Sequence, residues 1–122
     1  MELSSKRILI VDDEDTLRET LMDYLELQGA SVLEARNGNE AFDIIQNGGI
    51  DLVLSDIKMP ECSGIELLKK VQTYERKTPP IIMMSGFTDF SESQIKDLGA
   101  KAMFMKPGTL SQLKELILET IT

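Results

Sequence analysis

The stretch that decides the fold of this chain reads Asp51-Leu52-Val53-Leu54-Ser55-Asp56-Ile57-Lys58-Met59-Pro60. It contains a short apolar run, then a carboxylate, and it ends at a proline, which cannot continue a central strand. A run bounded this tightly is typical of a strand that is buried on both faces of a parallel sheet. Ligands of open α/β sheets bind beyond the carboxyl ends of the strands. We therefore expect Asp56 to lie where chemistry takes place.

The composition indicates a single domain that binds neither nucleic acid nor membranes. The length of 122 residues is sufficient for one domain with its own core. A formal net charge of −8, from 21 acidic and 13 basic side chains, argues against direct binding to nucleic acid or to an anionic membrane surface. No apolar stretch approaches the ~20 residues of a membrane span, and the first residues do not resemble a signal peptide.

Cysteine and histidine usage restricts the chemistry further. Cys62 is the only cysteine, so the chain cannot form an internal disulfide, and we expect a reduced, cytoplasmic setting. The chain has no histidine, which excludes imidazole base catalysis and zinc sites built on histidine. Any metal would have oxygen ligands, and this favours Mg²⁺ or a similarly hard ion.

Apolar runs alternate with helical patterns along the whole chain. Besides the opening stretch, the runs that predict strands are 7–11, 31–35, 81–84 and 102–105. Helical spacing of apolar residues predicts five helices. The first ends near Gln28, the second lies around 41–45, the third follows Ser63-Gly64, and the last two cover 88–98 and 110–121. The alternation predicts an α/β fold in which a doubly wound, five-stranded parallel sheet is covered by five helices.

Polar side chains follow four of the predicted strands. Because parallel strands end at the same edge of a sheet, these groups can converge there: Asp12 with Asp13, Asp56, Ser85 and Lys106. Three carboxylates repel one another, and a divalent cation and the ammonium group of Lys106 would compensate them. A carboxylate can attack phosphorus to form an aspartyl phosphate, with the metal and the lysine stabilising the transferred group. The hydroxyl of Ser85 could donate to a phosphoryl oxygen.

Each of these residues also has a structural interpretation. Asp12 or Asp13 could cap the helix that follows or interact favourably with its dipole. Asp56 could start a loop, and Lys106 could be a solvated surface charge. Any one of these signals is weak by itself, but their occurrence at successive strand ends favours a common site.

The motifs, taken in order, resemble a response-regulator receiver domain (CheY-like), the phosphoacceptor half of bacterial-type two-component signalling. The resemblance covers nearly the whole chain through Ile10-Val11-Asp12-Asp13-Glu14, Asp56-Ile57-Lys58-Met59-Pro60, Ser85-Gly86 and Lys106-Pro107. It implies a flavodoxin-like sheet of order 2-1-3-4-5. It also implies Mg²⁺ bound by Asp12, Asp13, Asp56 and the backbone carbonyl of Lys58. Ser85 would be the switch hydroxyl and Lys106 the phosphate-contacting lysine.

The resemblance also implies partners. Asp56 would take its phosphoryl group from a sensor histidine kinase or a phosphotransfer protein. The face of the fourth helix, fifth strand and fifth helix would then signal to a downstream protein. We expect residues 1–122 to be one receiver domain that is not an enzyme and lacks an output domain.

Two positions depart from the pattern of most receivers. Met103 stands where most have an aromatic residue, and Gly108 where many have phenylalanine. Phe104 comes one residue after Met103, and alternation along a strand would turn it to the other face of the sheet.

Two other functions fit parts of the pattern. A Mg²⁺-dependent phosphatase or phosphotransferase with an aspartate nucleophile, of the haloacid dehalogenase kind, would need a second aspartate where this chain has Lys58. The other alternative is an interaction module that works independently of phosphorylation. The presence of all five site residues counts against it.

Overall fold

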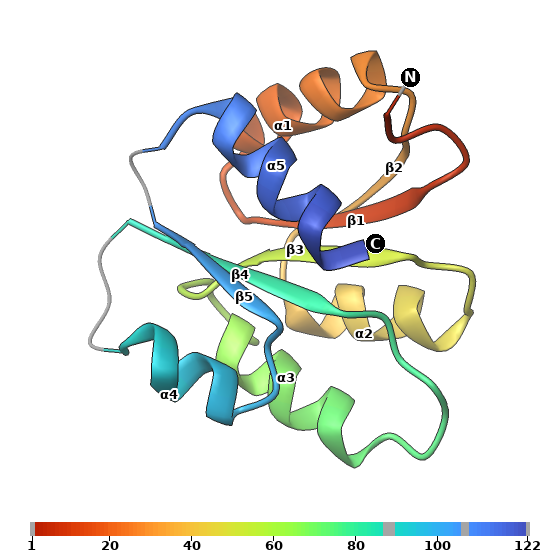
Figure 1. Ribbon diagram of the computed structural model, residues 1–122. Coiled ribbons are helices and arrows are strands. Elements are labelled where there is room, and N and C mark those ends of the chain that lie inside the picture. Colours follow the sequence, from red (N-terminus) through yellow and green to blue (C-terminus); the bar gives the residue numbers. More distant parts are fainter. Residues whose placement is uncertain (1, 87–89, 106–107, 122) are drawn as a thin grey trace.

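The computed structural model describes residues 2–86, 90–105 and 108–121 (Figure 1). Within these residues, five strands alternate with five helices in the order that the sequence predicts. The elements are β1 (Arg7–Val11), α1 (Asp15–Leu27), β2 (Ser31–Ala35), α2 (Gly38–Gln46), β3 (Leu52–Asp56), α3 (Gly64–Thr73), β4 (Ile81–Ser85), α4 (Glu92–Asp97), β5 (Ala102–Met105) and α5 (Leu110–Ile121).

The strands form one parallel sheet in the order β2-β1-β3-β4-β5. β3, the strand of the opening stretch, lies at the centre between β1 and β4. Val11 pairs with Ser55, so β1 and β3 end side by side. This arrangement confirms the doubly wound α/β fold and the strand order that the family resemblance implies.

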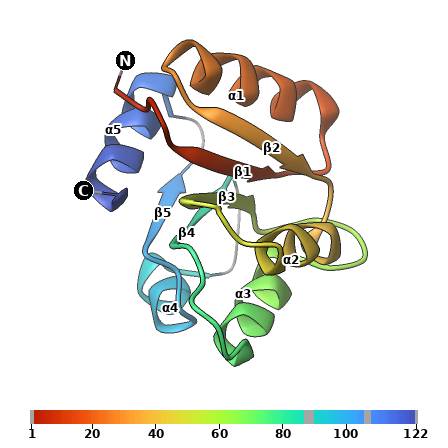
Figure 2. The ribbon, with the colours of Figure 1, turned by 90° about the vertical axis from the view of Figure 1, so that its right-hand side faces the viewer.

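The helices form a layer on each side of the sheet. α1 and α5 cover one face, and α2, α3 and α4 cover the other (Figure 2). Successive strand residues therefore enter different cores: Leu9 packs on the α2–α4 side and Ile10 on the α1–α5 side. Burial on both faces explains why the strands read as continuous apolar runs. Among the described helices, none is long and apolar enough to span a bilayer.

The predicted start of the fourth helix was wrong. Residues 88 and 89 lie outside the described residues, and α4 begins only at Glu92, one residue after its N-cap Ser91. The hydroxyl of Ser91 accepts a hydrogen bond from the backbone N–H of Gln94 (3.1 Å), and the Gln94 side chain accepts one from the Ser91 N–H (2.8 Å). This capping box fixes where the helix starts. Ile95 is its one buried residue.

The connection from β3 to α3 turns back tightly against the end of β3. α3 begins at Gly64, where a Cβ atom would collide with the backbone carbonyl oxygen of Asp56. Ser63 caps the helix by accepting from the backbone N–H of Glu66 (3.2 Å), and Glu66 accepts in return from the Ser63 N–H (3.3 Å). Glycine is therefore required at position 64, so that the loop from 57 to 63 stays next to Asp56.

Candidate functional site

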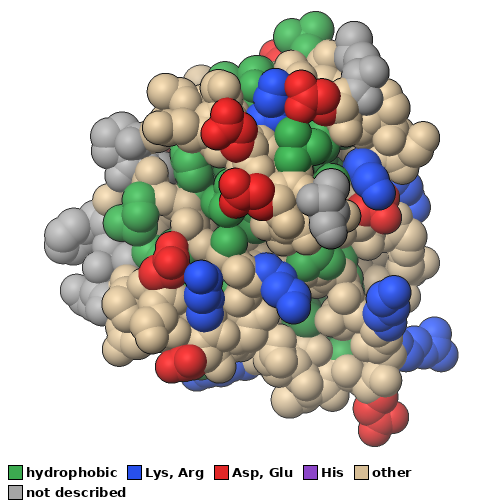
Figure 3. All heavy atoms as spheres, in the orientation of Figure 1, with side chains coloured by type: hydrophobic (Ala, Val, Ile, Leu, Met, Phe, Trp, Pro, Cys, Tyr) green, Lys and Arg blue, Asp and Glu red, His purple; other side chains and the backbone are tan. Residues whose placement is uncertain are grey.

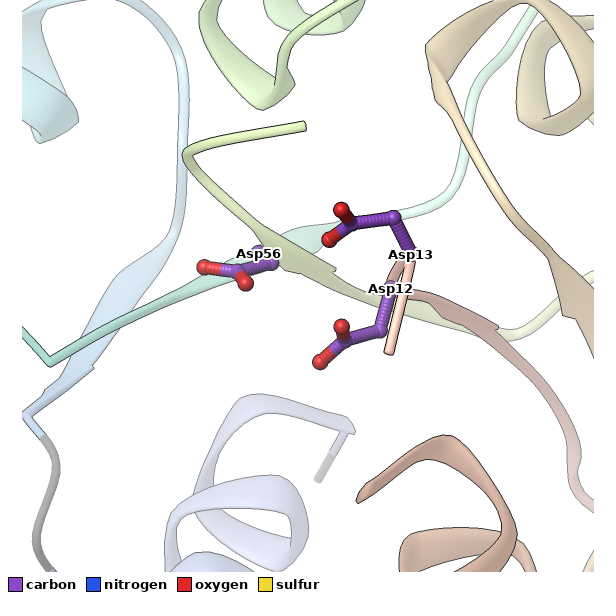
Figure 4. A group of neighbouring side chains, drawn as sticks. All are labelled: Asp12, Asp13 and Asp56. Carbon is purple, nitrogen blue, oxygen red and sulfur yellow. The ribbon is translucent and has the colours of Figure 1, made fainter. Parts of the chain in front are cut away.

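Three carboxylates meet at the carboxyl ends of β1 and β3. Asp12 and Asp13 follow β1 directly, and Asp56 is the last residue of β3. One carboxylate oxygen from each lies within 4.8 Å of the others, and Figure 4 shows the three side chains around a common space. The sequence predicts this convergence, because neighbouring parallel strands end at the same edge of the sheet.

The three carboxylates have different environments. Asp12 is completely buried, and its Oδ1 accepts a hydrogen bond from the backbone N–H of Glu14 (2.9 Å). Asp13 is exposed. Asp56 is half-buried, and its Oδ1 accepts from the backbone N–H of Ile57 (2.8 Å). The N-cap of α1 is Glu14, so neither Asp12 nor Asp13 occupies the capping position that was the structural alternative for them.

A pocket of about 430 Å³ opens beside this cluster. Its lining residues are Asp13, Glu14, Asp56, Ile57, Lys58, Ser85 and Gly86. Ser85 is buried at the end of β4 and pairs with Met105 of β5. The structure thus brings Ser85 and Lys58 to the same pocket as Asp56. Lys106, the remaining predicted site residue, lies outside the described residues.

The donor set fits a small, hard cation. All the clustered side-chain donors are carboxylate oxygens, which Mg²⁺ prefers. Mg²⁺ commonly binds to one or two protein carboxylates and keeps waters or phosphate oxygens at its other positions. The open pocket next to Asp13 and Asp56 leaves space for such ligands.

A buried arginine contacts the backbone of the acidic cluster. Arg18 of α1 is 3% exposed. Its Nη1 donates to the backbone carbonyl of Asp12 (2.8 Å), its Nη2 to Oδ1 of Asp15 (2.6 Å) and its Nε to Oε1 of Glu34 (2.7 Å). The hydrogen bond and charge of Arg18 hold the pKa of Asp15 below its ordinary value. Burial by itself lowers the pKa of Arg18, but the bonds to Asp15 and Glu34 raise it overall, so the guanidinium stays charged.

The sequence analysis missed Arg18, although a signal was present. Arg18, Leu21 and Leu25 are the buried residues of α1, and their spacing of three and four places them on one face of the helix. The spacing of the leucines could therefore have placed Arg18 on the inner face. The pattern does not reveal what the guanidinium binds there.

A second feature missed from the sequence connects the start of α2 to the β3–α3 loop. The backbone N–H of Gly38 donates to the carbonyl of Cys62 (2.9 Å), and Nδ2 of Asn37 donates to Oε2 of Glu61 (3.1 Å). Glu61 has a φ of 68°, in the left-handed region that is unusual for a residue with a side chain. Burial raises the pKa of the Cys62 thiol. The loop that contains Lys58 is thus fixed at its far end.

The fold and the cluster of Asp12, Asp13 and Asp56 define a class of protein. It is a flavodoxin-like α/β protein whose site lies at the carboxyl ends of its parallel strands. The family model described as "Response regulator receiver domain" matches residues 8–118. The chain therefore belongs to the response-regulator receiver family, the phosphoacceptor domains of two-component signalling. Such receivers are signalling domains rather than enzymes.

Curated relatives with similar sequences include one of nearly the same length and one that is much longer. Sporulation initiation phosphotransferase F of Bacillus subtilis is 34% identical over 116 residues, which cover 94% of this chain and 93% of the relative. Regulatory protein AtoC of Escherichia coli is 38% identical over 113 residues, covering 91% of this chain. The matched part spans 24% of AtoC, so the activity of that whole protein does not transfer to this chain.

Solved structures with similar folds agree with this assignment. A CheY-like receiver domain protein from Methanospirillum hungatei has a TM-score of 0.86 at 36% identity, covering 95% of this chain and 93% of its own. The response regulator TrrA from Thermotoga maritima, solved in complex with Mg²⁺ and BeF, has a TM-score of 0.84 at 33% identity, covering 94% of this chain and 98% of its own.

Proposed function

We propose that Asp56 is the phosphoacceptor of this receiver domain and that Mg²⁺ supports the transfer. The observation that carries the proposal is the cluster in which oxygens of Asp12, Asp13 and Asp56 lie within 4.8 Å of one another. Of these three residues, Asp56 ends the central strand and lines the pocket together with Ser85. Asp12 is completely buried, which leaves it suited to hold a metal rather than to meet a phosphodonor.

Each residue of the site has a separate task in this proposal. Asp12, Asp13, Asp56 and the backbone carbonyl of Lys58 would hold the metal. Bound Mg²⁺ neutralises charge on the transferred phosphoryl group. The N–H of Ile57 holds Oδ1 of Asp56 and so orients the carboxylate for attack. The Ser85 hydroxyl donates to a phosphoryl oxygen, and Lys106 provides a positive charge to the same group.

The partners follow from the family. The phosphoryl donor is a sensor histidine kinase or a phosphotransfer protein, and the domain works in the cytoplasm. Support comes from the phosphotransferase name of the Bacillus subtilis relative and from the Mg²⁺ and BeF in the Thermotoga maritima structure.

The output surface in this proposal is the face of α4, β5 and α5. It has a groove of about 350 Å³ lined by Lys96, Lys101, Ala102, Leu116, Glu119 and Thr120. Met105 is 53% exposed at the end of β5. Figure 3 views the molecule from the side of α5 and shows apolar atoms between charged side chains of both signs. A downstream protein would bind to this mixed surface, and a phosphoryl group on Asp56 would change its conformation through Ser85.

Mass spectrometry after incubation with acetyl phosphate and Mg²⁺ tests the assignment. The wild-type protein should gain one phosphoryl mass, and Asp56→Asn should gain none, because the amide keeps the shape of the side chain and removes the nucleophilic charge. Asp51→Asn is the matched control, since Asp51 lies just before the opposite end of the same strand. This variant should be phosphorylated like the wild type. Full phosphorylation of Asp56→Asn would show that another residue is the acceptor.

The lifetime of the modification separates a signalling domain from an enzyme that turns over phosphoryl groups. A receiver retains the group on the protein once the donor has been removed, whereas a phosphatase or phosphotransferase releases it in every catalytic cycle. Rapid gel filtration followed by intact-mass measurement at several times would distinguish them. Continuous consumption of acetyl phosphate, with no phosphorylated protein present, would favour the enzyme.

A further inference from the structure

We propose that Arg18 is a positioning residue for the acidic cluster. Its bond to the carbonyl oxygen of Asp12 fixes the peptide that joins Asp12 to Asp13 and so holds both carboxylates in the arrangement that binds Mg²⁺. This inference rests on the proposed function, in which the cluster is the metal site. Arg18 does not touch the metal or the phosphoryl group in this account, and it acts only through the backbone.

The bond lies at the one peptide that controls both side chains. Asp12 is already held at its N–H, which donates to the carbonyl of Ala35 (3.1 Å), and at its Oδ1, which accepts from the Glu14 N–H (2.9 Å). Its carbonyl belongs to the peptide plane shared with Asp13, and Nη1 of Arg18 binds it at 2.8 Å. Without this bond, the plane could rotate and move the carboxylate of Asp13 relative to that of Asp12.

Arg18 is itself held rigidly. Its Nε binds Glu34 of β2 and its Nη2 binds Asp15 at the start of α1, so its three nitrogens have partners in three parts of the fold. The planar guanidinium fixes the angles between these bonds. A lysine ammonium could supply the same charge, but it could not span the three partners in this geometry.

The charges around Arg18 argue against a role in neutralising the cluster. Asp15 and Glu34 pair directly with its guanidinium, so the three side chains together have a net negative charge. The group therefore offers little positive charge to the metal site. Burial of a guanidinium is also unfavourable compared with an apolar side chain of similar size. Position 18 belongs to the inner face of α1 with Leu21 and Leu25, where an apolar residue would fit the core. Holding the carbonyl of Asp12 accounts for an arginine at this position.

Nuclear magnetic resonance on Arg18→Lys and Arg18→Met tests the proposal without a phosphodonor. In the metal-free protein, the carbonyl carbon of Asp12 and the amide of Asp13 should shift in both variants, because the carbonyl loses the guanidinium donor that is fixed in place by Asp15 and Glu34. Titration with Mg²⁺ should then give a half-saturation concentration about tenfold above that of the wild type, the size found when partners that orient metal ligands are removed. Because lysine keeps the charge, an equal effect in the two variants identifies geometry as the cause.

Two further variants separate positioning from general stability. Glu34 is exposed and is one of the partners that hold Arg18. Glu34→Ala removes this partner and should raise the half-saturation concentration of Mg²⁺ by less than Arg18→Lys does. Ile117→Val weakens the core at α5 without touching the cluster, and it should leave Mg²⁺ binding unchanged. If Arg18→Met does not fold, Arg18→Lys and Glu34→Ala decide the question.

The outcomes also separate this inference from the proposed function. Wild-type affinity for Mg²⁺ in Arg18→Lys would overturn the positioning role. If Mg²⁺ causes no shifts at Asp12, Asp13 and Asp56 of the wild type, the metal site of the proposed function is wrong. In that case, the resonances of Asp12 and Asp13 in the metal-free protein decide whether Arg18 holds the peptide between these two residues. If they are the same in Arg18→Lys as in the wild type, the inference is overturned.

Discussion

Gly38 and Cys62 are in contact so close that position 38 cannot accept a side chain without movement. A Cβ atom built on Gly38 would lie 2.5 Å from Sγ of Cys62 and 3.1 Å from the Cys62 carbonyl oxygen. The same pair shares the hydrogen bond from the Gly38 N–H to that carbonyl. Packing at the start of α2 is therefore coupled directly to the loop that contains Lys58.

Gly38→Ala should destabilise the domain by about 1–3 kcal/mol, the usual cost of overpacking a well-packed site. Denaturant unfolding measures this change. Combining it with Cys62→Ala removes the sulfur and leaves a methyl group, so the double variant should be more stable than the sum of the two single effects predicts. Simple additivity of the two substitutions would show that the sulfur is not the atom that opposes the new methyl group.

The Cys62 thiol should make stability depend on pH in alkaline solution. Burial raises its pKa in the folded protein, whereas the unfolded chain loses this proton near the ordinary pKa of about 8.5. Above that pH the unfolded state binds fewer protons than the folded state, so stability falls as pH rises toward the folded pKa. Between pH 8 and about 10, the free energy of unfolding of the wild type should fall relative to Cys62→Ala, by at most ~1.4 kcal/mol per pH unit. Parallel curves would contradict this prediction.

Asp13→Asn should stabilise the metal-free protein by about 1 kcal/mol, because it removes one of three like charges that the proposed metal site requires and folding does not. Denaturant melts in EDTA measure this change. Added Mg²⁺ should stabilise the wild type more than the variant, since the variant loses a carboxylate ligand. A variant that is less stable than the wild type in EDTA would show that charge repulsion at the cluster is not a significant cost.

Met103→Tyr should sharpen the response of the α4, β5 and α5 face to phosphorylation. Met103 is buried on the α2–α4 side of β5, whereas Phe104 packs on the α1–α5 side, as alternation predicts. Methionine is flexible and can fill or vacate space without a two-state rotamer change. The wild type should therefore show a graded shift of backbone amide resonances with beryllofluoride, and the variant a larger one. Full slow-exchange switching in the wild type that Met103→Tyr leaves unchanged would exclude this role of Met103.

The fold and the acidic cluster were predictable because both follow from short sequence patterns. Apolar runs such as 7–11 and 102–105 gave the strands with the observed bounds. Asp13 lies just after β1 and Asp56 at the end of β3, and the ends of parallel strands meet at one edge of the sheet, so their convergence was predictable. The predicted start of α4 was wrong because the apolar pattern from 88 to 98 is weak, and the capping box at Ser91 begins the helix at Glu92.

The supporting contacts could not be predicted in the same way. Arg18 reaches Glu34 across 16 residues of sequence, and Asn37 reaches Glu61 across 24. Such pairs depend on the register between strands and on how each helix packs, and neither is encoded in the local pattern of one segment. Lys106 was predicted as part of the site and lies outside the described residues, so its contribution stays a prediction.

Ile95 is the one buried residue of α4, and this has a consequence for how the protein can diversify. Glu92, Ser93, Lys96 and Asp97 are exposed, and substitutions there should change the free energy of unfolding by no more than about 0.5 kcal/mol. If α4 belongs to the proposed output surface, changes in this helix would alter which downstream protein is recognised with little loss of stability. Under the proposed function, the residues that choose the partner would be separate from Asp56 and its phosphoryl chemistry, so that one set could evolve while the other is retained.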